Sequence, residues 1–200
     1  MSRRAEGDGK VTPAEINSFW IDEIGEKGWY QQSDAVDQTI RNRFMEAWDV
    51  SGSLAQDWED TPEGALAALI LTDQFPRNMF RGDPRSFETD ELARAIADRA
   101  IAAGHDLATP EPQRQFFYLP FEHSENLDHQ DRAVALFAER MPGENLRHAK
   151  LHRDTIARFG RFPWRNEALG RAPTEAEQKV MDAGGYGALV SGKLSLDALD

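Results

Sequence analysis

Apolar side chains recur along most of the chain at the three- and four-residue spacing of amphipathic helices. One stripe of residues four apart is typical of the pattern: Val36, Ile40, Phe44 and Trp48. The sequence contains no alternating β-branched run and no Asn-Gly hairpin turn, which are the usual signals of strands. The pattern therefore predicts an all-α protein.

Capping signals and prolines set the expected helix boundaries. Thr12 to Glu15 and Thr174 to Glu177 have the spacing of capping boxes, and Pro76 and Pro120 are expected to end helices. The segment 65–71 is apolar on all sides and predicts a buried central helix. Helices are predicted at about 12–28, 33–48, 61–75, 89–103, 109–119, 128–140 and 144–159, then from 174 onward, with a short one at 195–200.

The loops between these helices are short, which favours antiparallel neighbours. No change of composition marks a second domain. We expect residues 1–10 to form a disordered or extended polar tail and residues 11–200 to form a single all-α domain of about eight or nine helices. A strict 34-residue period is absent, but stacked helical hairpins remain compatible with the pattern.

Composition narrows the class of protein. The chain has 200 residues and no cysteine, which excludes disulfides and thiolate chemistry. Its net charge of −12 would repel a phosphate backbone, so nucleic acid is not expected as a partner. No apolar run approaches the roughly 18 residues that span a bilayer, and the polar start of the chain does not resemble a signal peptide. These observations predict a soluble cytoplasmic protein without a membrane partner.

Positive charge is carried mainly by arginine, with 18 arginines against 5 lysines. Arginine binds carboxylates and phosphates through two parallel hydrogen bonds, so its clusters are candidate anion sites. Internal pairing with nearby carboxylates is the structural alternative. The clustered arginines are Arg77, Arg81 and Arg85, and then Arg153, Arg158, Arg161, Arg165 and Arg171.

Asp73 falls on the apolar stripe of the predicted central helix, which places a carboxylate on a buried face. A buried carboxylate must be paired, hydrogen-bonded or neutralised. It either clamps the corner formed by Phe75, Pro76, Arg77 and Asn78 or acts as a general base.

Four of the five histidines lie between His123 and His152. His148 and His152 are four residues apart, as in some zinc-binding helices, but the accompanying glutamate of that motif is absent. No metal site is therefore assigned, and the cofactor is not determined by the sequence. A hydrogen-bonded role for His152, inside the protein, is the alternative.

Three blocks carry a resemblance to a known family: residues 73–78 with Arg81-Gly82, residues 120–125, and residues 152–171 with Phe159-Gly160-Arg161-Phe162-Pro163. Together with Trp29-Tyr30, they resemble the bacterial domain-of-unknown-function 924 family between about residues 20 and 181. The resemblance implies an all-α fold similar to tetratricopeptide-like stacked hairpins, and no established activity. Trp164 stands where the family often has histidine.

Two functional hypotheses follow. In the first, three chain corners form a pocket for a small anionic molecule, bound or chemically converted. A histidine would carry the proton, oriented by a carboxylate. The candidate catalytic residues are Asp73, His123, Glu125 and His152, and the candidate ligand-binding residues are Arg77, Asn78, Arg161, Arg165 and Asn166.

In the second hypothesis, the helical hairpins form a protein-interaction module and the polar corners are purely structural. That alternative predicts that the charged groups saturate one another and leave no pocket. A purely structural network, which only keeps the helices in register, is a third interpretation.

Overall fold

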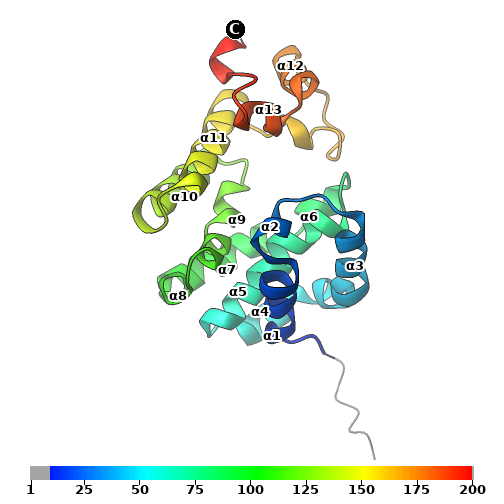
Figure 1. The fold of residues 1–200 in the computed structure, drawn as a ribbon, viewed down its shortest axis with the longest axis vertical. Helices are drawn as coiled ribbons and strands as arrows, with labels where there is room; N and C mark the ends of the chain where they lie inside the picture. The colour runs from blue at the N-terminus through cyan, green and yellow to red at the C-terminus, as the bar shows by residue number, and fades with distance from the viewer. Residues whose placement is uncertain (1–9, 200) are drawn as a thin grey trace, which may run out of the picture.

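The computed structural model describes residues 10–199, and within that range it contains helices and turns but no strand (Figure 1). The predicted all-α class is confirmed. The predicted N-terminal tail lies outside the described residues except for Lys10, which is exposed. No helix within the described residues has the length and apolar character needed to cross a membrane.

The first half of the chain begins its helices where the capping signals predict. Thr12 forms a complete capping box with Glu15, and Ser33 and Thr61 cap the next two predicted helices. The elements are α1 (Pro13–Asn17), a π-helical segment (Ser18–Ile24), α2 (Gly25–Trp29), α3 (Asp34–Asp49), α4 (Ser51–Trp58), α5 (Pro62–Leu69), a second π-helical segment (Ile70–Gln74), α6 (Phe75–Met79) and a 3-10 turn (Pro84–Phe87).

In the second half, Gly104 and Gly160 adopt left-handed conformations directly after the predicted ends of two helices. Thr174 and Glu177 form the other capping box. The elements are α7 (Asp90–Ala102), α8 (His105–Ala108), a 3-10 turn (Gln113–Phe117), α9 (Leu119–Glu122), α10 (Leu127–Arg140), α11 (Glu144–Phe159), a 3-10 turn (Pro163–Arg165), α12 (Glu175–Ala183), α13 (Tyr186–Val190) and a 3-10 turn (Leu196–Ala198).

Helix α5 is central to the main core, as its apolar sequence predicts. Every residue from Gly64 to Leu69 is buried. Around it the rings of Phe44 and Phe75 stack with centroids 4.8 Å apart, and Trp20 meets Phe75 edge-on at 5.6 Å. Burying aromatic rings of this size supplies much of the apolar area that stabilises a small domain.

Pro76 does not end the central helix, contrary to the prediction. The chain passes through a π-helical segment at Ile70–Gln74 and continues as α6. Proline removes the hydrogen bond to the carbonyl four residues earlier, which is that of Thr72. The Thr89 hydroxyl donates to this carbonyl at 2.6 Å, so the lost partner is replaced. The chain therefore stays helical from Asp73 to Arg77.

The helix predicted from 109 to 119 is also wrong. The chain forms only a 3-10 turn there, after a cis peptide bond between Glu111 and Pro112. Pro120 lies in the first turn of α9 instead of ending a helix. The first turn tolerates proline because its N–H groups have no partner within the helix.

The described residues form more and shorter helices than the eight or nine predicted, because α4, α8 and α13 were not foreseen. Helices α10 and α11 pack against each other, and α12 and α13 lie beyond α11 at the C-terminal end (Figure 1). This end has a small apolar cluster of its own, which contains Val180, Leu189 and Leu199.

Candidate functional site

A cleft of about 1150 Å³ lies where the C-terminal helices face the main body. Its lining residues come from α2, α6, α9, α11, α13 and the turn at Pro163–Arg165. The cleft therefore joins parts of the chain that are far apart in sequence. Its volume is large enough for a small organic molecule.

Asp73 and His123 form a carboxylate–imidazole pair at this cleft. Nδ1 of His123 lies 3.0 Å from both carboxylate oxygens of Asp73, which is fully buried. Burial raises the pKa of Asp73, but the charge of Arg77 and the hydrogen bonds from His123 and Gln74 outweigh it, and the pKa is lowered to about 2. Asp73 is therefore an acceptor at neutral pH.

The same environment favours the neutral form of His123. Burial lowers the pKa of His123, and the attraction of Asp73 offsets this only in part, because Arg77 opposes it. A neutral imidazole beside a carboxylate donates its single N–H from Nδ1. Nε2 is then the unprotonated nitrogen, on a side chain that lines the cleft.

A second carboxylate–imidazole pair lies next to the first. Oε1 of Glu122 is 3.0 Å from Nδ1 of His152, which is also 3.0 Å from the carbonyl oxygen of His148. The ring centroids of His123 and His152 are 6.5 Å apart. All four side chains of Glu122, His123, His148 and His152 line the cleft.

Positive charge reaches the cleft from α6 and the turn that follows it. Nη2 of Arg77 is 2.9 Å from Asp90, and Nε of Arg81 is 2.5 Å from Asp37. Asn78 donates to the same Asp37 at 2.8 Å. Both arginines and Asn78 line the cleft. A guanidinium has five N–H donors, so such pairing leaves donors for an anion.

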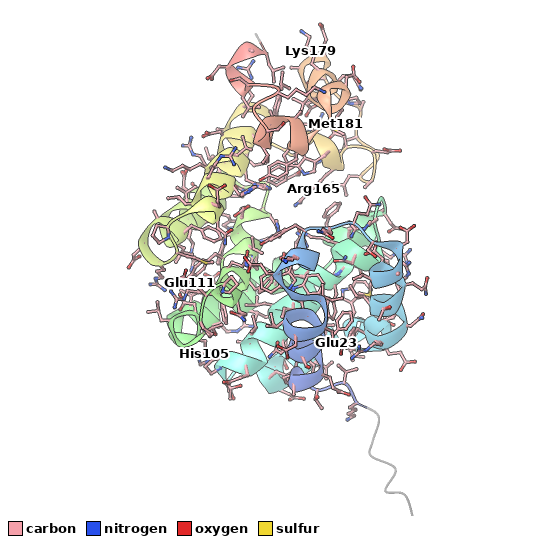
Figure 2. All side chains as sticks on the ribbon, viewed as in Figure 1. Glu23, His105, Glu111, Arg165, Lys179 and Met181 are labelled. Carbon is pink, nitrogen blue, oxygen red and sulfur yellow. The ribbon has the colours of Figure 1, made fainter. Side chains whose placement is uncertain are left out.

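Arg165 lies behind the site and does not line the cleft. Its Nη2 donates to the carbonyl oxygen of His123 at 2.8 Å, and its guanidinium carbon lies 4.7 Å from the centre of the Phe162 ring. Burial, followed by the charge of Arg77, lowers the pKa of Arg165 to about 10. Figure 2 shows Arg165 between the C-terminal helices and the main body. Arg165 therefore positions the backbone of His123.

Glu125, Arg161 and Asn166 are not among the residues that line the cleft. Glu125 accepts from Arg171 at 2.7 Å, and Arg161 donates from Nε to Glu177 at 2.5 Å. The amide of Asn166 is buried, and neither of its polar atoms has a hydrogen-bond partner. Of the predicted site residues, Arg77, Asn78, His123 and His152 thus line the cleft, and Asp73 lies buried against His123; the others lie outside the cleft.

Sequence reasoning did not select Glu122 or Tyr186 as functional candidates. The block Phe121-Glu122-His123 contained the signal for Glu122, but only the contact with His152 distinguishes it from Glu125. Tyr186 follows two glycines, which indicate a turn and conceal the start of α13. Between residues 10 and 199, no group of three or more His, Asp or Glu side chains is arranged to hold a metal ion.

Comparison with known proteins agrees with this architecture. The chain matches the family described as bacterial protein of unknown function (DUF924) over residues 16–185, and it belongs to that family. The solved structure of a protein of unknown function from Agrobacterium tumefaciens is similar, with 42% sequence identity and a TM-score of 0.81. The similarity covers 86% of this chain and 97% of that one. No curated protein matches the chain.

Proposed function

We propose that the cleft binds a small anionic molecule and that His123 accepts a proton from it. Arg77 and Arg81 hold the anionic group, and Asp73 orients the imidazole. Proton transfer of this kind serves hydrolases and lyases, and it requires a base whose pKa lies near or below the working pH.

The pairing of Asp73 with His123 is the observation that carries this proposal. A carboxylate on Nδ1 selects the tautomer with a free Nε2, which is the arrangement used by histidine bases. The depressed pKa of His123 keeps this nitrogen unprotonated at neutral pH. Arg77 and Arg81 line the same cleft as His123. An anionic group bound by these arginines would therefore bring the adjoining atoms of the ligand toward Nε2 of His123.

A binding screen on the intact protein tests the proposal. Thermal unfolding is followed with inorganic phosphate, sugar phosphates and small carboxylates. A ligand at about 100 times its Kd should add about 2.7 kcal/mol to the free energy of unfolding. In the variant Arg81→Gln, the affinity for the anion should fall about tenfold or more, because a charge-assisted hydrogen bond contributes roughly 1.5–3 kcal/mol.

Lys179→Gln is the matched control because Lys179 is an exposed cation in α12 that does not line the cleft; Figure 2 labels it. Its affinity for the anion should equal that of the wild type. Equal loss of affinity in both variants would mean that net charge alone attracts anions. No shift with any anion would rule out the proposed function.

The second candidate function is a protein-interaction module. The α10–α11 pair is a helical hairpin of the kind that stacks in tetratricopeptide-like superhelices. An open groove of about 660 Å³, lined in part by Leu151, Leu189 and Leu194, lies at the C-terminal end. This candidate is favoured if Leu151→Asp abolishes capture of a cellular protein while anions produce no stabilisation. The cytoplasmic location stays a prediction from composition.

A further inference from the structure

Glu122 differs from the other buried carboxylates around the cleft. Asp73 and Asp90 both pair with Arg77. Glu122 has a side chain that is only 4% exposed, and among the described residues its ion-pair partner is His152. Its second oxygen, Oε2, is buried and has no hydrogen-bond partner. One end of the cleft therefore contains a carboxylate with an unsatisfied oxygen.

An unsatisfied carboxylate oxygen is costly inside a protein, because the lost hydration is not replaced. Buried carboxylates are ordinarily satisfied by a cation or by several N–H donors. Glu122 lines the cleft, so a donor group of a ligand bound there would lie next to this residue. A positively charged group would satisfy the oxygen and also balance the charge.

The surroundings of Glu122 suit an ammonium group. The rings of Tyr186 and His152 have centroids 4.6 Å apart, and Trp164 lies 5.2 Å from Tyr186. These rings and Tyr30 line the same cleft. Aromatic faces attract organic cations through their quadrupoles and bind hydrated anions poorly. The negative charge of Glu122 and the aromatic rings near it therefore both favour an organic cation.

His123 lies between the two charged ends. Arg77 and Glu122 both act on it, with opposite effects on its pKa: the charge of Arg77 lowers the pKa and that of Glu122 raises it. Asp73 links His123 to Arg77, and Glu122, the residue before His123, pairs with the neighbouring His152 ring. The carboxylate that pairs with Arg77 and the carboxylate of Glu122 each contact a different imidazole, and the centroids of these two rings are 6.5 Å apart, which favours a ligand whose charges are several bonds apart.

We propose that Glu122 and the aromatic rings of Tyr30, Trp164 and Tyr186 bind a protonated amine of the ligand whose anionic group lies at Arg77 and Arg81. The ligand class is a zwitterion in which a chain of several carbon atoms separates the ammonium from the anion. This inference rests on the proposed function, and it places the reacting atoms beside His123, between the two charges.

Four five-carbon compounds test the proposal against the intact protein. Valerate carries the anion alone, glutarate carries a second anion, 5-aminovalerate carries a distant ammonium, and norvaline carries an ammonium beside its carboxylate. Binding is measured by calorimetry and by thermal shift. We expect 5-aminovalerate to bind at least tenfold more tightly than each of the other three.

The variant Glu122→Gln assigns the preference to its residue. It retains the size of the side chain and an acceptor for His152 but removes the charge. We expect the affinities for 5-aminovalerate and valerate to come within twofold of each other, with valerate unchanged. A preference that persists in Glu122→Gln would overturn the assignment, and Glu122 would then only orient His152.

The outcomes separate this inference from the proposed function. If valerate and 5-aminovalerate bind the wild type equally, or if norvaline is preferred, the amine site is wrong and the anion site stands. If none of the four binds while other anions stabilise the protein, the same conclusion holds. If no anion binds at all, both proposals fail. The wild-type comparison decides these outcomes even if Glu122→Gln does not fold.

Discussion

Two polar corners that look alike in the sequence differ in the partners of their carboxylates. At the cleft, Asp73 is bonded to His123 and also pairs with Arg77. At the other corner, Glu125 is bonded to Arg171, and Glu177 to Arg161. Each corner contains a Phe-Pro segment that is followed by Arg and Asn, at residues 75–78 and 162–166. Arg161, Arg165 and Asn166 do not line the cleft, whereas Arg77 and Asn78 do.

The difference shows that the partner of a buried carboxylate decides whether the group is available for chemistry. Arginine stays protonated, so a carboxylate whose charged partners are all arginines is satisfied and mainly fixes structure. An imidazole uses one nitrogen for the carboxylate and keeps the other for a ligand. Charge and burial alone do not separate the two cases.

The comparison would be tested most strongly by removal of Asp73. Asp73→Ala leaves Arg77 and His123 without their buried partner, and removing one member of a buried pair costs about 3–5 kcal/mol. We expect a loss of this size in the free energy of unfolding, measured with urea at pH 7, together with loss of anion binding. A loss below about 1 kcal/mol would show that the pair is not a tightly coupled element of the core.

Removing the charge of Glu177, at the corner that does not bind the anion, should lower stability by an intermediate amount and leave anion binding unchanged. Hydrogen bonds from Arg161 hold the pKa of Glu177 at about 2, below its usual 4.5, so its contribution to stability is present above pH 4.5 and is lost as the pH falls toward 2. Glu177→Gln should lower the free energy of unfolding at pH 7 by about 1–3 kcal/mol.

The free energy of unfolding of Glu177→Gln should also depend less on pH below pH 4.5 than that of the wild type. Its affinity for the anion should equal that of the wild type. A weaker affinity in Glu177→Gln would contradict the separation of the two corners. Arg161→Gln is the reciprocal variant, and it should reproduce the loss of stability.

His123→Asn should have the smallest effect on stability and a decisive effect on proton transfer. The asparagine amide can replace the Nδ1–H donor to Asp73, so unfolding should change by less than about 1 kcal/mol. The variant lacks Nε2 and should not accept a proton from a bound ligand. Nitrogen NMR of the wild type should show His123 neutral at pH 6.5, with the proton on Nδ1.

The lowered pKa of His123 also makes the stability of the wild type depend on pH. Because burial lowers the pKa of His123 in the folded state, the unfolded chain takes up this proton first as the pH falls below about 6.5. Wild-type stability should therefore decrease in that range, and His123→Asn should lack this component. A protonated His123 at pH 6.5 would remove its role as a base.

Local sequence was sufficient where helix ends depend on neighbouring residues. The boundaries at Thr12, Ser33, Gly160 and Thr174 are confirmed because caps act within one turn. Pro76 was interpreted wrongly because its effect depends on Thr89, which satisfies the freed carbonyl from another element. The helix predicted at 109–119 was wrong because Pro120 lies in the first turn of α9, a position that residue spacing alone does not determine.

The sequence by itself determined that the protein is helical, that Asp73 is buried, and that arginine and histidine gather at a few corners. Helix periodicity and helix capping depend on residues that are close in sequence, so the spacing of residues along the chain reveals them. Tertiary structure decided which carboxylate meets which cation, since Glu122 rather than Glu125 reaches His152, and Glu125 is bonded to Arg171. The physical reason is that hydrogen bonds act over about 3 Å, whereas the residues that make these pairs are separated by 30 to 46 positions along the chain.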